Sequence, residues 1–234
     1  MSIGAVLDET WTLFTRFFGR FFAIAIVVFG AINLLYALVV SAISADNDGT
    51  AFVLALLAIV TVVVGTTWLQ GAFVYAVQDA RDGTFDSSIR EVFARVSSAI
   101  VPLLVASILA GLGIAFGLVL LIVPGLFLLT IWAVIAPVIV VERRRATESF
   151  GRSRELVRGH GWTVFGIVLI TGLLSGVATT LLQAAFSFLP RFLEILIGST
   201  VAQAVVAPFS AIAIAIMYFR LREQHDAVMA PPAP

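Results

Sequence analysis

The residue types best able to do chemistry gather in one segment of the chain, between Glu142 and Trp162. An arginine at a membrane surface attracts anionic headgroups and contributes about 1 kcal/mol to their binding. A run of arginines is also a topology signal with a solvated face, and that plainer interpretation stays open. The sequence predicts that these arginines contact anionic lipid. They are Arg143, Arg144, Arg145, Arg152, Arg154 and Arg158.

Acid–base and metal chemistry are disfavoured. Glu142, Glu155 and His160 lie in the same segment, but a general acid or base needs a cleft and a partner, and their sequence surroundings show neither. The chain has 2 histidines and no cysteine, so it lacks a thiol nucleophile and a clustered set of metal ligands. It also lacks a phosphate-binding glycine loop. We expect no enzymatic activity, no metal and no cofactor.

Four amide side chains interrupt segments that are otherwise apolar. Inside a bilayer an amide needs a hydrogen-bond partner away from lipid. The plainer interpretation is a bond between neighbouring helices, and the alternative is a polar point in a substrate cavity. The four residues are Asn33, Gln70, Gln183 and Gln203.

Two GxxxG patterns also occur in apolar segments. Small residues let membrane helices approach closely, which strengthens packing where no hydrophobic drive exists. We expect helix packing within the bundle, with an oligomer interface as the alternative. The pairs are Gly113 with Gly117 and Gly172 with Gly176.

The elements that carry these residues must be transmembrane helices. The chain is 61% hydrophobic, with a mean hydropathy of +1.10, whereas the surface of a soluble domain must be largely polar. A helix needs about 20 apolar residues to cross a bilayer. Stretches without Asp, Glu, Lys or Arg cover 21–45, 49–78, 96–141, 159–190 and 195–219. They predict an all-α bundle of six spans in a single domain, 1–228, with spans near 20–43, 51–77, 99–122, 125–141, 161–187 and 195–219.

The stretch 96–141 is long enough for two spans and contains Pro124 and Gly125. Proline cannot donate a backbone hydrogen bond, and glycine tolerates unusual turn conformations. We therefore expect a tight hairpin turn at these two residues.

Three shorter segments have an apolar stripe at helical spacing beside charged residues, at 3–18, 85–96 and 148–158. This pattern is typical of amphipathic helices that lie in the membrane interface. Each segment directly precedes an odd-numbered span. The order predicts three repeated units, each with an interfacial helix followed by a transmembrane hairpin. We expect the tail, 229–234, to be disordered.

Arginine placement predicts the orientation. In a six-span arrangement every arginine except Arg191 falls on one side, and membrane proteins keep their positive charge on the cytoplasmic side. Both termini are then cytoplasmic, and we expect a multi-pass protein of a bacterial cytoplasmic membrane.

Residues 100–170 resemble the membrane domain that is fused to some glycerophosphoryl diester phosphodiesterases and that also occurs alone. The resemblance lies in Leu121–Leu128, in Trp132, in Ala136–Glu142 and in Ser149–Trp162. It implies a six-helix bundle and a link to phospholipid metabolism. It does not imply the esterase activity, which belongs to a separate metal-binding barrel that this chain has no room for.

Taken together, the sequence predicts a non-enzymatic scaffold or accessory protein in membrane lipid or envelope homeostasis. The expected partners are membrane lipids, with a second copy or another membrane protein as a further option and no nucleic acid. Two alternatives remain. One is a transporter or channel subunit for an apolar or lipid-like solute, which requires a cavity that reaches one of the four amides. The other is a lipid-modifying enzyme, which requires carboxylates or histidine to converge at one interface.

Overall fold

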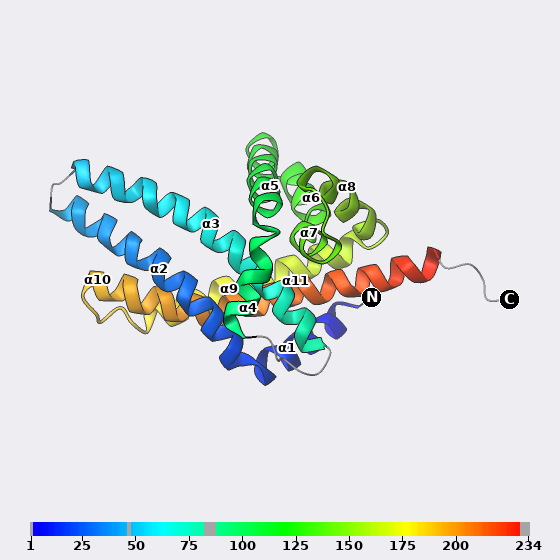
Figure 1. The fold of residues 1–234 in the computed structure, drawn as a ribbon, viewed down its shortest axis with the longest axis horizontal. Helices are drawn as coiled ribbons and strands as arrows, with labels where there is room; N and C mark the ends of the chain where they lie inside the picture. Colours follow the sequence, from blue (N-terminus) through cyan, green and yellow to red (C-terminus); the bar gives the residue numbers. More distant parts are fainter. Residues whose placement is uncertain (1, 46–47, 82–87, 230–234) are drawn as a thin grey trace.

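The computed structural model describes residues 2–45, 48–81 and 88–229, and all regular structure in these ranges is helical. Six helical segments are long and apolar enough to cross a membrane, as predicted. Figure 1 shows the helices in chain order. They are α1 (Ile3–Arg16), α2 (Phe18–Ser44), α3 (Asp48–Arg81), α4 (Ile89–Ser97), α5 (Ile100–Leu120), α6 (Ile122–Ile131), α7 (Ile135–Glu142), α8 (Ala146–Val157), α9 (Gly161–Ala184), α10 (Arg191–Leu193), a π-helical turn (Glu194–Ser199) and α11 (Thr200–Met229).

The observed spans agree with the predicted ones to within a few residues, except at the end of the last. They are Phe18–Ser44, Gly49–Arg81, Ile100–Leu120, Ile122–Glu142, Gly161–Ala184 and Arg191–Ala227. The last helix continues past the apolar stretch because nothing in its charged continuation breaks it. Of the predicted disordered tail, 229–234, the first residue still belongs to α11, and 230–234 lie outside the described residues. The start of the second amphipathic segment, 85–87, also lies outside them.

A short helix precedes each transmembrane hairpin, as the amphipathic segments predict. These helices are α1, α4 and α8. The start of α4 is well specified, because the Ser88 hydroxyl accepts the Glu91 amide hydrogen at 3.3 Å while the Glu91 carboxylate accepts the Ser88 amide hydrogen at 2.8 Å. The hydrogen bond from the Ser88 amide to the carboxylate is the largest cause of the lowered pKa of the Glu91 carboxyl.

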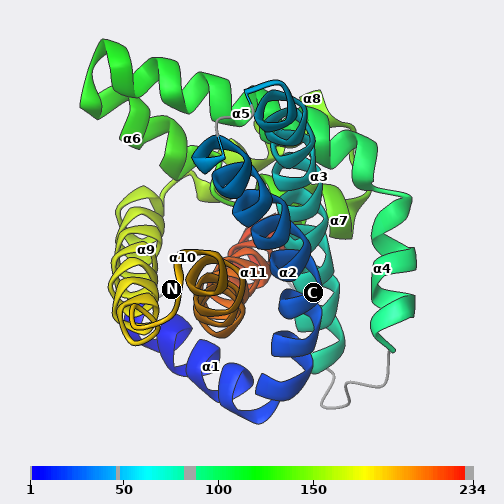
Figure 2. The same cartoon turned by 90° about the vertical axis from the view of Figure 1, so that its left-hand side faces the viewer.

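Helix α11 lies at the centre of the molecule, and Figure 2 shows α1, α2 and α9 around it. Its buried face is rich in alanine, which lets neighbouring backbones approach closely in the absence of a hydrophobic drive. The fully buried alanines are Ala202, Ala204, Ala213 and Ala215.

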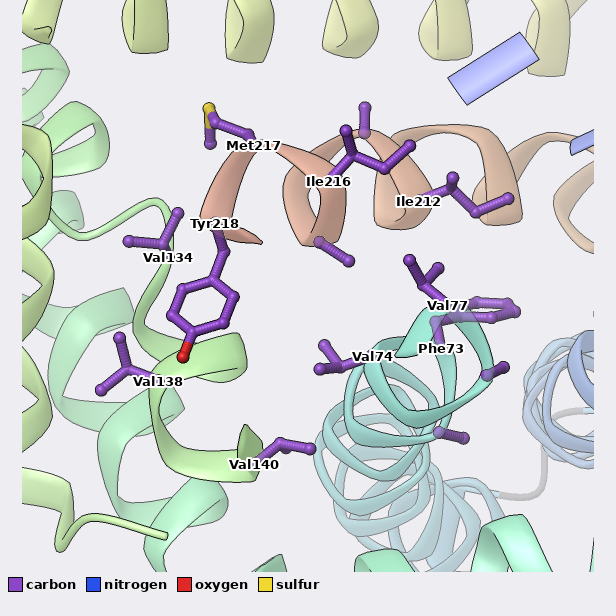
Figure 3. Packing of buried hydrophobic residues seen from close by; sticks show 14 of the residues in the cluster. Phe73, Val74, Val77, Val134, Val138, Val140, Ile212, Ile216, Met217 and Tyr218 are labelled. Atoms are coloured by element: carbon purple, nitrogen blue, oxygen red, sulfur yellow. The ribbon is translucent and has the colours of Figure 1, made fainter. Parts of the chain in front are cut away.

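The apolar core lies where α11 meets α3 and α7 (Figure 3). In that view the ring of Tyr218 points from α11 toward Val138 of α7. The remaining labelled core residues are Phe73, Val74, Val77, Val134, Val140, Ile212, Ile216 and Met217.

Prolines mark where helices begin in the second hairpin. Pro102, Pro124 and Pro137 each occupy the third position of their helix. The first four amide groups of a helix have no partner within it, so proline loses no hydrogen bond there. The predicted turn at Pro124 and Gly125 is therefore wrong in position. The helix ends at Leu120, one extended residue, Leu121, makes the connection, and Pro124 belongs to the first turn of α6.

The fourth span is broken in its middle, which the sequence analysis did not predict. Helix α6 ends at Ile131 and α7 begins at Ile135, with a turn between them. Pro137 explains the break, because it has no amide hydrogen for the carbonyl of Ala133 and its ring would clash there in a continuous helix. The Ser153 hydroxyl of α8 donates a hydrogen bond of 2.7 Å to the carbonyl of Ile131.

Glycine allows α5 and α6 to pack as a tight pair. A methyl group added at Gly117 would lie 3.0 Å from the backbone of Gly125, and one added at Gly113 would lie 2.7 Å from the ring of Trp132. The first GxxxG pattern thus sits against the fourth span. The α5–α6 pair diverges from the α2–α3 hairpin in both views (Figures 1 and 2).

The second GxxxG pattern packs against no other described part of the chain. Gly172 and Gly176 are exposed, and a methyl group added at either would meet nothing within 4 Å. The expected packing role inside the bundle is therefore wrong for this pair. Its neighbouring surface is an open face of α9.

Alanine substitution should separate the two glycine patterns. A methyl group at position 125 would lie 2.6 Å from the backbone nitrogen of Leu118, which cannot rotate away. We expect Gly125→Ala to lose about 1–3 kcal/mol through overpacking. Gly176→Ala is the matched control, because helix propensity favours alanine over glycine by about 1 kcal/mol. Thermal unfolding of the detergent-purified variants measures both, and equal melting temperatures would contradict the tight α5–α6 contact.

Candidate functional site

A nearly buried charge cluster forms where α7, α8 and α11 meet. The Glu142 carboxylate lies 3.1 Å from Nε of Arg152 and 2.8 Å from Nε of Arg144. The Tyr218 hydroxyl donates to the same carboxylate at 3.2 Å. The side chains of Glu142 and Arg152 are only 11% and 12% exposed, so their charges compensate each other in a poorly solvated place.

The cluster continues outward through Glu155. Arg152 donates to the Glu155 carboxylate at 3.1 Å, and His225 of α11 lies 3.7 Å from it. The hydrogen bond from Arg152 lowers the pKa of the Glu155 carboxyl.

A second ion-pair group lies on α1, α3 and α11. The Glu9 carboxylate accepts from Arg220 at 2.6 Å and lies 3.5 Å from Arg81. Arg81 also pairs with Glu223 at 2.9 Å and lies over the ring of Phe219, 4.8 Å from its centre. These contacts join the N-terminal helix to the ends of two spans at the arginine-rich end of the bundle.

The arginine segment contains two kinds of arginine. Arg144 and Arg152 pair with Glu142, so their charges are compensated within the protein. The other four are exposed and form no ion pair within the described residues. We name these four the α8 arginine surface: Arg143, Arg145, Arg154 and Arg158. The contact of all six arginines with anionic lipid stays a prediction.

Local backbone geometry and an aromatic residue shape this surface. Arg143 ends α7 in the left-handed region, with φ 52°, and this conformation turns the chain back into α8. Gly159, with φ 84°, follows α8 in the same region and separates it from α9. Trp162, in the first turn of α9, is 87% exposed, as expected for an interfacial anchor.

A cavity of about 540 Å³ lies between the divergent α5–α6 pair and the rest of the bundle. Its walls come from α2, α3, α5, α9, α11 and both sides of the α6–α7 break. The lining is mostly apolar and includes no ionisable side chain among the described residues. Its polar side chains are Thr66, Gln70, Ser107, Ser210 and the indole of Trp132.

The four predicted amides divide into three situations. Asn33 of α2 donates to Thr200 at 3.2 Å and to Gln203 at 3.5 Å, which joins α2 to α11 as the interhelical interpretation expects. Gln70 lines the cavity, is exposed and forms no side-chain hydrogen bond in the part of the chain described. Gln183 is half-buried near the end of α9 and does not line the cavity.

Two of the three candidate catalytic residues lie in one cluster with His225, which is 3.7 Å from Glu155, whereas His160 contacts neither glutamate among the described residues. Glu142 and Glu155 both bind Arg152, whereas His160 lies at the start of α9, with its buried Nδ1 lacking a partner in the described structure. Within residues 2–45, 48–81 and 88–229 no group of three histidine, aspartate or glutamate side chains could hold a metal ion.

Sequence reasoning missed several residues of these sites. Tyr218 and Ser153 gave no signal, because an isolated hydroxyl reveals nothing of a partner far away in the chain. Ser107 and Trp132 were likewise not recognised as cavity residues. Pro137 was a usable signal, since a proline inside an apolar span predicts a break.

Truncation of Glu142 should destabilise the protein strongly. Glu142→Ala leaves Arg152 with only the more exposed carboxylate of Glu155 as a partner, so we expect a loss of about 3 kcal/mol, at the low end for breaking a buried ion pair. The double variant Glu142→Ala/Arg152→Ala should recover part of that loss. Glu194→Ala is the control, because its pair with the exposed Arg191 contributes about 0–1 kcal/mol. Chemical unfolding in detergent checks the series, and similar losses at positions 142 and 194 would contradict the cluster's structural role.

A comparison of this chain with known protein families, curated proteins and solved structures finds no match.

Proposed function

We propose that this protein is a non-enzymatic membrane protein that binds anionic lipid headgroups at the α8 arginine surface, in an accessory or scaffold role in membrane lipid or envelope homeostasis. The observation that carries this proposal is the division of the arginine segment. Arg144 and Arg152 form ion pairs with Glu142. The four arginines of the α8 arginine surface are exposed and form no ion pair within the described residues. Unpaired guanidinium groups suit phosphate oxygens, which they bind through two parallel hydrogen bonds.

The rigid support under this surface favours headgroup binding over a merely solvated face. Helix α8 is attached on its inner side by Arg152 to Glu142 and by Ser153 to the carbonyl of Ile131. Arg154 lies next to these anchored residues, so less side-chain and backbone freedom must be lost when a headgroup binds.

The arginine-rich end supports the proposed orientation. We place this end at the cytoplasmic face of a bacterial cytoplasmic membrane, with α1, α4 and α8 near the lipid–water interface. In this placement the exposed indoles of Trp11 and Trp162 lie at headgroup level. The order of one short helix before each hairpin also supports three repeated units.

A second candidate function is supported by a different observation. The cavity reaches Gln70, as the transporter or channel alternative requires, and it supports binding of a lipid-like molecule inside the bundle. The lipid-modifying enzyme is not proposed, because Glu142 and Glu155 are both engaged by Arg152 and His160 contacts neither of them among the described residues.

Removal of the four arginines should abolish selectivity for anionic lipid. We expect the variant Arg143→Gln/Arg145→Gln/Arg154→Gln/Arg158→Gln to lose its preference for phosphatidylglycerol over phosphatidylcholine, at about fivefold per arginine. Native mass spectrometry of the full chain, titrated with the two lipids carrying identical acyl chains, measures this preference.

The control is Arg90→Gln, which removes an exposed arginine of α4. It should keep nearly all of the preference, and both variants should melt like the native protein. An unchanged preference in the fourfold variant, or an equal loss on removal of Arg90 alone, would refute the α8 arginine surface as the headgroup site.

A further inference from the structure

The cavity beside the α6–α7 break carries an inference that does not depend on the α8 arginine surface. We propose that it binds a single-chain amphiphile with an uncharged, hydroxyl-bearing head, taken up sideways from the bilayer. Its volume of about 540 Å³ falls within the range of about 300–1,000 Å³ that is usual for small-molecule sites.

The hydrogen-bonding groups of the cavity indicate what the head of the ligand must be. The hydroxyls of Thr66 and Ser210 are already used, because they donate to Val62 at 2.6 Å and to Ala207 at 3.2 Å. Gln70 and Ser107 line the cavity and form no side-chain hydrogen bond within the described residues. An amide and a hydroxyl on neighbouring helices thus have donors and acceptors to spare.

A third polar group comes from the broken span. Ala133 lines the cavity, and Pro137 has no amide hydrogen to donate to its carbonyl. An unbonded carbonyl in an apolar site is unfavourable, and a ligand hydroxyl that donates to it would relieve this. The amide of Gln70 can then donate to the same ligand's ether, ester or hydroxyl oxygen.

The absence of charge in the described lining excludes a charged head. A phosphate or carboxylate buried there would have no cation to compensate it, and an unpaired buried charge is far more costly than a hydroxyl. The remaining lining is hydrocarbon from α3, α5 and α11, which suits an acyl or isoprenoid chain. The preferred ligand is therefore neutral at the head and apolar elsewhere.

Access from the lipid is open between α3 and α5. Gln70 is exposed although it lines the cavity, and Gly111 of α5, which also lines it, is exposed, with nothing within 4 Å of an added methyl group. The α5–α6 pair diverges from α3 on this side (Figure 2). A molecule dissolved in the bilayer can reach the polar groups without crossing water.

Trp132 lines the cavity and provides the test. The full chain, with Trp11, Trp68 and Trp162 replaced by phenylalanine, keeps one indole, and bromine atoms on a lipid chain quench its fluorescence on contact. We expect dibrominated monoacylglycerol to quench Trp132 saturably, and the lysophosphatidic acid with the same brominated chain to quench it only as a bulk lipid does.

Variants in the same single-tryptophan background identify the polar groups. Gln70→Leu/Ser107→Ala should raise the Kd for the monoacylglycerol about tenfold, as expected for the loss of two neutral hydrogen bonds. Ser107→Thr, which keeps the hydroxyl, should bind better than Ser107→Ala. Gln183→Leu, an amide outside the cavity, and the fourfold arginine variant should bind like the parent.

Each other result overturns the inference. Quenching that never saturates would show that no site exists, and equal or stronger binding of the anionic lipid would show that the head is not selected for neutrality. An unchanged Kd in Gln70→Leu/Ser107→Ala, with a native melting temperature, would show that Gln70 and Ser107 do not hydrogen-bond to the head of the ligand. Because the fourfold arginine variant is measured in parallel, failure here is distinguishable from failure of the α8 arginine surface.

Discussion

Inside a bilayer, a backbone carbonyl that leaves a helix must find its partner within the protein. The fourth span meets this constraint at the α6–α7 break, where Pro137 cannot donate to the carbonyl of Ala133. One carbonyl of the break, that of Ile131, is satisfied by Ser153 from α8. Trp132, which lies in the break, packs its indole against the backbone of Gly113 in α5 and against the ring of Phe150 in α8. Helix α8 is thus attached at the break through Ser153, and residues on both sides of the break line the cavity.

Helix α8 connects the charged surface to the interior. Its buried side holds Ser153 against the break and Phe150 against Trp132, while Arg152 is fixed by Glu142 of α7. Its exposed side carries the unpaired Arg154. A ligand bound at the exposed side of α8 would therefore contact a helix whose other side packs against Trp132, a residue of the cavity wall. The Glu142–Arg152 pair holds α8 against α7, which precedes it in the chain.

The sequence predicted the number and place of the spans because hydrocarbon thickness fixes how long an uncharged helix must be. It could not predict partners. Glu142 and Tyr218 lie 76 residues apart, and no local pattern relates them. The two GxxxG patterns are alike in sequence, yet Gly113 contacts Trp132 and Gly176 contacts nothing. The spacing of two glycines shows that another helix could pack closely on that face. Whether one does depends on which helix the fold places beside it. Gln70 was identified as a cavity candidate, but its unpaired state depends on the divergence of α5.

The two kinds of polar group are segregated, and this bears on what the protein can handle. Charged side chains of the cluster and of the α8 arginine surface occupy one end of the molecule, where those of the cluster are compensated by ion pairs and those of the surface are exposed. The polar side chains of the described cavity lining are an amide, hydroxyls and an indole. Under the two proposals, a phospholipid would bind the surface by its charged head, whereas the cavity would take a molecule whose head is neutral. Because the charged and uncharged polar groups lie in different places, the two proposed sites would select different lipids and would not compete for the same one.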